Sequence, residues 1–168
     1  MSAVTTVISD FGGVLTSPLI ETFAALNEED GLDAGALGTA LTRIAERDRA
    51  HPLFELECGR MTEHAFLQRL MNQLREDVGR DIRLHTFAER YFAHLKPNEP
   101  MLDLLGELRE RGYRLALLTN NVREWESQWR AMAPIDEIFE LVVDSAFVGM
   151  RKPDPAIYRL TCERLDVA

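Results

Sequence analysis

Residues 3–13 of the chain read AVTTVISDFGG. The first part, Ala3 to Ser9, is rich in Val, Thr and Ile, and these residue types favour a short buried strand. Gly12 and Gly13 follow closely and favour a tight turn. Asp10 stands between the strand and the turn, so we expect its carboxylate at the carboxyl end of the first strand.

Four helical patterns follow this turn. Pro18 can open the first, and Asp33 can cap the second by accepting hydrogen bonds from the first backbone N–H groups. Thr62 can cap the third in the same way, and the fourth runs from about Leu84 to Leu95. Between Ser17 and Lys96 the sequence predicts helices and no strand.

Short apolar runs alternate with helical patterns after Pro97. A helix that ends at Gly112 precedes a strand over Tyr113–Leu118, and a third strand is expected over Leu141–Val143. Asp154 can cap the final helix. This alternation of strands and helices indicates βαβ units and a parallel sheet.

The predicted fold class is therefore α/β, with a Rossmann-like parallel sheet and an inserted helical cap. A length of 168 residues fits one domain, or a core with a modest insertion. We expect the core to comprise residues 1–16 and 97–168. Residues 17–96 would form the cap.

The composition argues against several classes of protein. The net charge of -9 disfavours a nucleic-acid partner, which a basic face would attract. The apolar runs are too short for a membrane span, and the first residues lack the basic start of a signal peptide. Cys58 and Cys162 match no metal-binding spacing, so we expect free thiols in a cytoplasmic protein.

Polar residues follow each of the three expected strands. Asp10 ends the first strand, and Thr119 and Asn120 end the second. Lys152 lies in the loop after the third. The carboxyl ends of parallel strands share one edge of a sheet, so these side chains should meet there. A carboxylate, a hydroxyl with nearby N–H groups and an ammonium can together hold and transfer a phosphoryl group.

Taken singly, these residues predict little. Thr119 and Asn120 alone are typical of a strand-to-helix turn, and Lys152 alone is typical of a solvated loop. The prediction of a site rests on the order and spacing of all the polar groups together.

The same segments resemble the motifs of the haloacid dehalogenase superfamily of hydrolases. Its first motif is similar to residues 10–15 (DFGGVL), its second to residues 118–121 (LTNN) and its third to residues 151–155 (RKPDP). Residues 57–62 (ECGRMT) before a helix are typical of the helical cap in this group. The pattern is most similar to the subgroup that resembles the N-terminal phosphatase domain of soluble epoxide hydrolases.

The resemblance implies roles for the site residues. Asp10 would be the nucleophile and a Mg²⁺ ligand, with the Gly12 carbonyl as a second ligand. Thr119 and Asn120 would bind the transferred group, and Lys152 would offset the charge of nucleophile and intermediate. Magnesium suits this chemistry, because it takes oxygen ligands and keeps water and phosphate in its shell.

Two departures from the family pattern affect these expectations. Phosphatases of the family usually carry a second aspartate, the general acid and base, where this chain has Gly12. Water or another residue would have to replace it, or the leaving group would need no proton, so we expect a preference for aryl or acyl phosphates. The family's fourth, acidic motif has no counterpart before Ala168. We therefore expect an inactive fragment, or a homodimer that pairs the open edge of Ala3–Ser9.

Three functions remain open at this point. The first is a Mg²⁺-dependent phosphatase acting through an aspartyl-phosphate on a small phosphorylated metabolite. The second is a haloacid-type dehalogenase, in which Asp10 attacks the carbon of a small halogenated substrate. The third is a non-catalytic binding module, which Gly12 and the missing fourth motif favour.

Overall fold

The computed structural model describes residues 4–167. Three parallel strands form one sheet in the order β1–β2–β3, with β1 at Thr6–Ser9, β2 at Arg114–Thr119 and β3 at Leu141–Asp144. The α/β class and the three strands are thus confirmed. Of the first expected strand, Ala3 lies outside the described residues, and residues 6–9 are β1.

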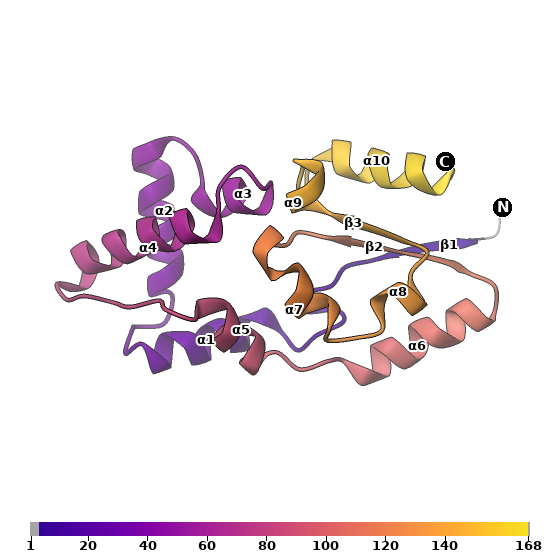
Figure 1. The fold of residues 1–168 in the computed structure, drawn as a ribbon, viewed down its shortest axis with the longest axis horizontal. Helices are drawn as coiled ribbons and strands as arrows, with labels where there is room; N and C mark the ends of the chain where they lie inside the picture. The colour runs from indigo at the N-terminus through magenta and orange to yellow at the C-terminus, as the bar shows by residue number, and fades with distance from the viewer. Residues whose placement is uncertain (1–3, 168) are drawn as a thin grey trace.

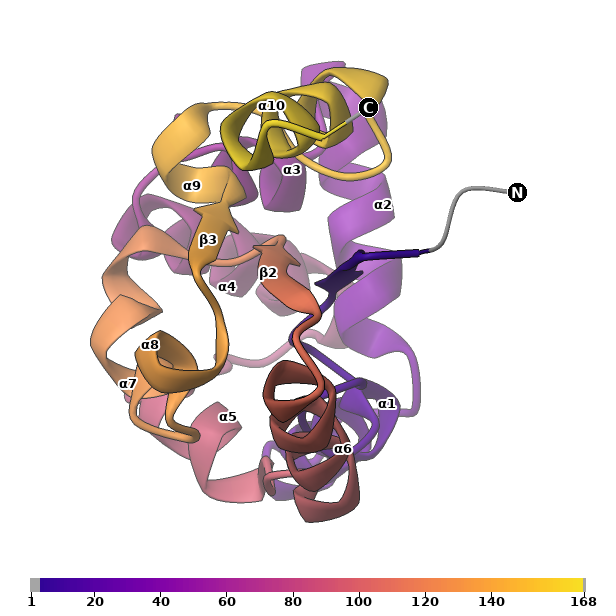
Figure 2. The same ribbon diagram turned by 90° about the vertical axis from the view of Figure 1, so that its right-hand side faces the viewer.

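Helices cover both faces of the sheet (Figure 2). One face carries α6 (Glu99–Glu110), the 3-10 helix Arg123–Trp125, α7 (Glu126–Arg130) and α8 (Ile135–Ile138). The other carries α9 (Ser145–Val148) and α10 (Pro155–Leu165).

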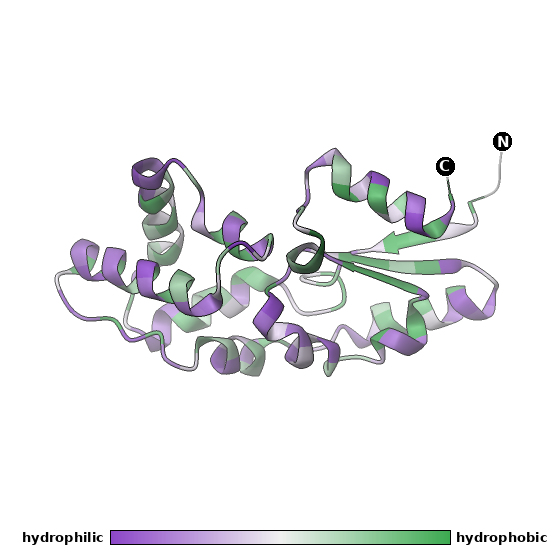
Figure 3. Ribbon diagram, turned by 45° about the horizontal axis from the view of Figure 1, so that its top comes forward, coloured by the Kyte–Doolittle hydropathy of each residue, from purple (hydrophilic) through white to green (hydrophobic). Residues whose placement is uncertain are grey.

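The side chains of β2 point alternately to the two faces, as the period of a strand requires. Leu115 and Leu117 pack with the buried Trp129 on the α6 side. Leu118 packs with Ile157 of α10 on the other side. The strands of the sheet are accordingly hydrophobic along much of their length, whereas hydrophobic and hydrophilic residues alternate along the helices (Figure 3).

A helical block fills the interval between β1 and α6 (Figure 1). It contains α1 (Leu19–Glu29), α2 (Ala36–Asp48), α3 (Pro52–Glu57), α4 (Glu63–Val78) and α5 (Phe87–His94). These helices share a core of buried apolar residues that includes Leu26, Leu56, Leu70, Leu74 and Leu84. The block therefore has a hydrophobic core of its own beside the sheet.

The two connections between the block and the sheet lie side by side. Thr16 and Pro97 form an isolated antiparallel bridge, and the Ser17 N–H donates to the Lys96 carbonyl at 2.8 Å. The Asn98 side chain adds a hydrogen bond to the Val14 carbonyl at 2.8 Å. We call this pairing the neck. It lies at the boundaries proposed for the inserted cap.

The predicted helix ends were partly right. Thr62 caps α4 by accepting from Ala65 N at 3.2 Å, and Asp154 caps α10 by accepting from Ala156 N at 2.8 Å. Asp33 is not a side-chain cap, because the chain turns through Gly35 at a φ of 83° and α2 begins only after it.

The fourth helix begins at Phe87 rather than at Leu84. Leu84 is buried in the core of the helical block from an irregular segment. Its apolar character therefore reflects packing rather than a helical turn.

Strand β1 is an edge strand within residues 4–167, where it pairs only with β2. The expected homodimer through this edge stays a prediction. Cys58 and Cys162 are both free, as expected. Within the described residues, none of the helices combines the length and the apolar character needed to cross a membrane.

Candidate active site

Asp10 directly follows β1 and is anchored through one of its two carboxylate oxygens. Oδ1 accepts a hydrogen bond from the Phe11 N–H at 2.7 Å and lies 2.6 Å from the Lys152 ammonium. Among the described residues, no hydrogen bond reaches Oδ2, and the side chain is 43% exposed. The carboxylate is thus oriented by one oxygen while the other is available to a ligand.

Lys152 reaches Asp10 from the loop after β3, across more than one hundred positions of sequence. Its ammonium also donates to the Leu118 carbonyl at 2.8 Å. The Asn120 side chain makes two hydrogen bonds to the Lys152 backbone, donating to its carbonyl at 3.1 Å and accepting from its N–H at 2.8 Å. The predicted ion pair between Lys152 and Asp10 is confirmed, and Asn120 fixes the backbone that carries the lysine.

Thr119 is buried at the end of β2. It lines the same cavity as Gly12 and Asn120. The Asn120 amide is already used by the Lys152 backbone in this structure, so binding of the transferred group by Thr119 and Asn120 stays a prediction.

A cavity of about 240 Å³ lies between the helical block and the strand ends. Its polar part is formed by Gly12, Thr119, Asn120, Asn121 and Glu57. The remaining walls are apolar side chains of the block and of the segment after β2, among them Leu19, Phe23, Leu56, Phe66, Phe87 and Trp125. The cavity therefore suits a ligand with a polar end and an apolar body.

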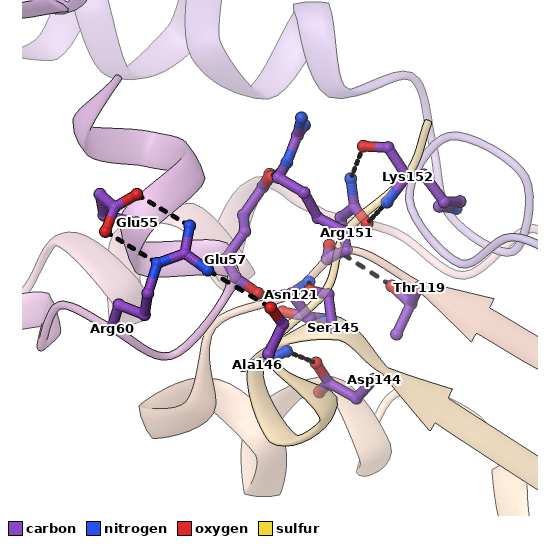
Figure 4. Close-up of polar contacts among 12 residues, drawn as sticks. Glu55, Glu57, Arg60, Thr119, Asn121, Asp144, Ser145, Ala146, Arg151 and Lys152 are labelled. Carbon is purple, nitrogen blue, oxygen red and sulfur yellow. Dashed lines mark hydrogen bonds and ion pairs between the residues drawn. The ribbon is translucent and has the colours of Figure 1, made fainter. Parts of the chain in front are cut away.

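Glu57 is a polar residue of this cavity that the sequence did not single out as a site residue. Its Oε2 accepts a hydrogen bond from Arg151 Nε at 2.5 Å, and its side chain is 14% exposed. Burial is the main cause that raises the pKa of Glu57, and the charge of Asp10 acts in the same direction. Arg151 and Lys152 oppose this shift. Figure 4 shows Glu57, Arg151 and Lys152 in one polar region.

The turn after α3 packs closely on the segment after β3. Ser145 Oγ donates to the Glu57 carbonyl at 2.6 Å and accepts from the Asn121 N–H at 3.1 Å. Gly59 has a φ of +65°, and a Cβ there would lie 2.2 Å from the Ala146 carbonyl oxygen. Only glycine fits so close an approach.

Asp144 ends β3 beside Thr119, and no pattern in the sequence marks it as a site residue. Its Oδ1 accepts from the Ala146 N–H at 2.9 Å, which caps α9. Its Oδ2 is buried without a hydrogen-bond partner among the described residues. Burial is the main cause that raises the pKa of Asp144 to about 6.

Comparison with known proteins identifies the family. The family description "haloacid dehalogenase-like hydrolase" matches residues 4–168. The chain belongs to this family. Bifunctional epoxide hydrolase 2 of Sus scrofa is 29% identical over 170 residues, which cover 94% of this chain and 30% of that protein. Glyceraldehyde 3-phosphate phosphatase of Pyrococcus abyssi is 38% identical over 78 residues, which cover 45% of this chain and 32% of that protein. The chain thus spans about a third of the length of these curated relatives.

Solved structures of the family share the fold. A HAD family enzyme from Bacteroides thetaiotaomicron in a magnesium complex aligns with a TM-score of 0.65 at 22% identity, over 99% of this chain and 80% of that one. An L-2-haloacid dehalogenase from Xanthobacter autotrophicus with chloropropionic acid covalently bound aligns with a TM-score of 0.63 at 19% identity, over 99% and 66% of the two chains. At these identities the likeness concerns the fold alone.

Proposed function

We propose that the chain is a phosphatase-type hydrolase whose Asp10 takes a phosphoryl group from a small phosphorylated metabolite and passes it to water. The observation that carries this proposal is the 2.6 Å pair of Asp10 and Lys152 at the strand ends. A carboxylate with one free oxygen can attack phosphorus, and the neighbouring ammonium offsets the charge that develops. Thr119 lies at the same edge and would bind the transferred group.

The residues at this edge of the sheet could supply some of the oxygen ligands of a Mg²⁺ ion. Asp10 offers the unpaired Oδ2. Gly12, two residues later, lines the cavity, and its carbonyl would be the second protein ligand. No group of three His, Cys, Asp or Glu side chains suited to a metal occurs within residues 4–167. Magnesium commonly keeps several waters and substrate phosphate oxygens beside one or two carboxylates. When bound, the ion would neutralise charge on the phosphate.

The cavity supports an apolar organic group on the substrate. Its walls are mostly leucine and aromatic side chains of the helical block, which we interpret as the cap that selects the substrate. An apolar group placed there would leave water, at about 25 cal/mol per Å² of buried surface. An aryl phosphate such as 4-nitrophenyl phosphate is therefore a suitable first substrate.

The test compares Asp10→Asn with a matched variant, Asp103→Asn, at an exposed position of α6. The proposed function requires an active chain rather than the inactive fragment that the sequence left open. We therefore expect Mg²⁺-dependent hydrolysis of 4-nitrophenyl phosphate by the wild type and by Asp103→Asn. Turnover should be lost in Asp10→Asn while the thermal unfolding profile is unchanged. Retained turnover in Asp10→Asn would reject this mechanism.

A second candidate function is haloacid dehalogenation, which Gly12 favours because a halide leaves without a proton. In this reaction Asp10 would attack carbon, and no magnesium would be needed. Chloride release from chloropropionate in the presence of EDTA would identify the dehalogenase. Binding of a phosphate mimic such as vanadate without turnover of either substrate would instead identify a binding module.

A further inference from the structure

The loop after β1 provides no acid for the proposed reaction. A Cβ at Gly12 would lie 3.0 Å from Leu19 Cδ1, so an apolar side chain of α1 already fills the adjacent space. An alkoxide leaving group needs a proton, and the attacking water must lose one. Another group in the cavity must therefore perform both transfers if the enzyme hydrolyses alkyl esters.

Two ionisable side chains line the cavity within the described residues, Glu57 and Tyr91. Tyr91 is buried among aromatic rings, and burial raises the pKa of its hydroxyl to about 12. A group that binds its proton so tightly cannot act as a base near neutral pH. Glu57 is the better candidate.

We propose that Glu57 is the general acid and base of this site, in the role that the family gives to the position occupied here by Gly12. The proposal rests on the phosphatase function proposed above. It places the acid–base group on the helical block and the nucleophile at the end of a strand of the sheet.

The surroundings of Glu57 hold it in place and leave one oxygen free. Ser145 binds its backbone carbonyl, and Arg151 binds Oε2. Among the described residues, no hydrogen bond reaches Oε1. Arg151 is itself packed, since its guanidinium carbon lies 3.8 Å from the centre of the Phe54 ring. The carboxyl group is thus fixed at one oxygen and can exchange a proton at the other.

The segment after β3 links the two carboxylates of the site. Its consecutive residues Arg151 and Lys152 contact Glu57 and Asp10, respectively. Among the described residues, the charged groups that act on Glu57 are Asp10, Arg151 and Lys152, and the titratable Tyr91 lies within the range of its charge. Burial and the nearby Asp10 carboxylate favour the protonated form, whereas the two cations favour the ionised form. A phosphate entering the cavity would add negative charge and favour protonation further.

With Glu57 in this role, each proton that the reaction requires has a donor and an acceptor. Asp10 attacks phosphorus, the bond from phosphorus to the alkoxide oxygen breaks, and the alkoxide takes the proton of Glu57. In the second step the Glu57 carboxylate removes a proton from water as the water oxygen attacks the aspartyl-phosphate. The bond from phosphorus to Asp10 breaks, and inorganic phosphate, free Asp10 and protonated Glu57 result.

The central experiment compares Glu57→Gln with the wild type on two substrates. Glutamine keeps an oxygen that can accept from Arg151 but cannot transfer a proton. On hexyl phosphate we expect a loss of about 10²–10⁴ in rate, the usual contribution of a general acid or base. On 4-nitrophenyl phosphate, whose leaving group needs no proton, a burst of 4-nitrophenolate should remain. The phosphorylated protein should then accumulate and be visible by intact-mass spectrometry.

Two further variants separate acid–base catalysis from a role in holding the block to the sheet. Glu57→Asp should restore part of the hexyl phosphate rate, because it restores a carboxyl group. Arg151→Gln removes the cation, so the limb of the pH–rate profile that belongs to Glu57 should move to higher pH. A purely structural role predicts neither result.

The outcomes of these experiments test the role of Glu57 separately from the proposed phosphatase function. Suppose that Asp10→Asn loses turnover, whereas Glu57→Gln hydrolyses hexyl phosphate at the wild-type rate. This result would overturn the role of Glu57 and leave the proposed phosphatase function intact. An unshifted pH profile in Arg151→Gln would also count against the role of Glu57. A wild-type chain without Mg²⁺-dependent turnover would overturn both proposals.

Discussion

Asp144 should make the stability of the protein depend on pH. Its carboxyl has a folded-state pKa of about 6, raised mainly by burial from an ordinary value of 3.8. The folded state therefore holds this proton more tightly than the unfolded state does. The resulting stabilisation is complete below about pH 4 and is lost as the pH rises through 6. At 1.36 kcal/mol for each pKa unit, the loss is about 3 kcal/mol.

Asp144→Asn tests this reasoning, because asparagine keeps a capping oxygen for the Ala146 N–H and cannot ionise. We expect the unfolding free energy of the variant, relative to the wild type, to rise by about 2.5 kcal/mol between pH 4 and pH 8, because part of the full change lies below pH 4. Urea titrations followed by tryptophan fluorescence measure it, and any constant cost of the new amide cancels in the comparison.

The matched control is Asp154→Asn, which makes the same change at the exposed cap of α10. Asp154 is exposed, so this variant makes the same substitution at a helix cap without burial. If the Asp144→Asn and wild-type free energies run parallel from pH 4 to pH 8, burial does not penalise the charge of Asp144 and the argument is wrong.

Three further predictions concern the cap contact, a helix end and the site. Gly59→Ala should lower the unfolding free energy in urea by about 1–3 kcal/mol, because the new Cβ would collide with the Ala146 carbonyl and strain a positive φ; an unchanged midpoint would contradict the close contact. Thr62→Ala should cost about 1 kcal/mol in the same assay through the lost cap of α4, and no loss would show that the cap is replaced by water. Lys152→Met should lower kcat for 4-nitrophenyl phosphate by roughly 10²-fold or more, and an unchanged kcat would exclude charge compensation of Asp10 by this lysine.

The strands and the longer helices could be predicted because each has a clear period or composition. The buried runs around β1, β2 and β3 and the spacing of apolar residues in α4 are signals of this kind. Helices α8 and α9 escaped prediction, since four residues are too few to show a helical period. The cap of α2 was misassigned because a glycine turn, rather than the available aspartate, sets where the helix begins.

Some residues of the site could likewise be predicted from the sequence, and others could not. Asp10 and Lys152 follow strands, so the topology of a parallel sheet was enough to predict that they meet. Glu57 lies in the helical block, and its position depends on how α3 packs against the segment after β3. No periodicity encodes that packing. The one available signal was the Glu-Cys-Gly sequence before α4, together with the absence of an acid at Gly12.

The neck between Thr16 and Pro97 has a consequence for how such a protein can change over evolution. Because the inserted segment leaves and rejoins the sheet at one place, its ends are held together whatever lies between them. Doubling the length of a flexible closed segment adds only about 0.6 kcal/mol of entropic cost. Insertions, deletions or exchange of helices other than α3, which carries Glu57, can therefore remodel the apolar walls of the cavity without displacing Asp10. In this architecture, the residues that select the substrate can therefore change during evolution while the nucleophile stays in place.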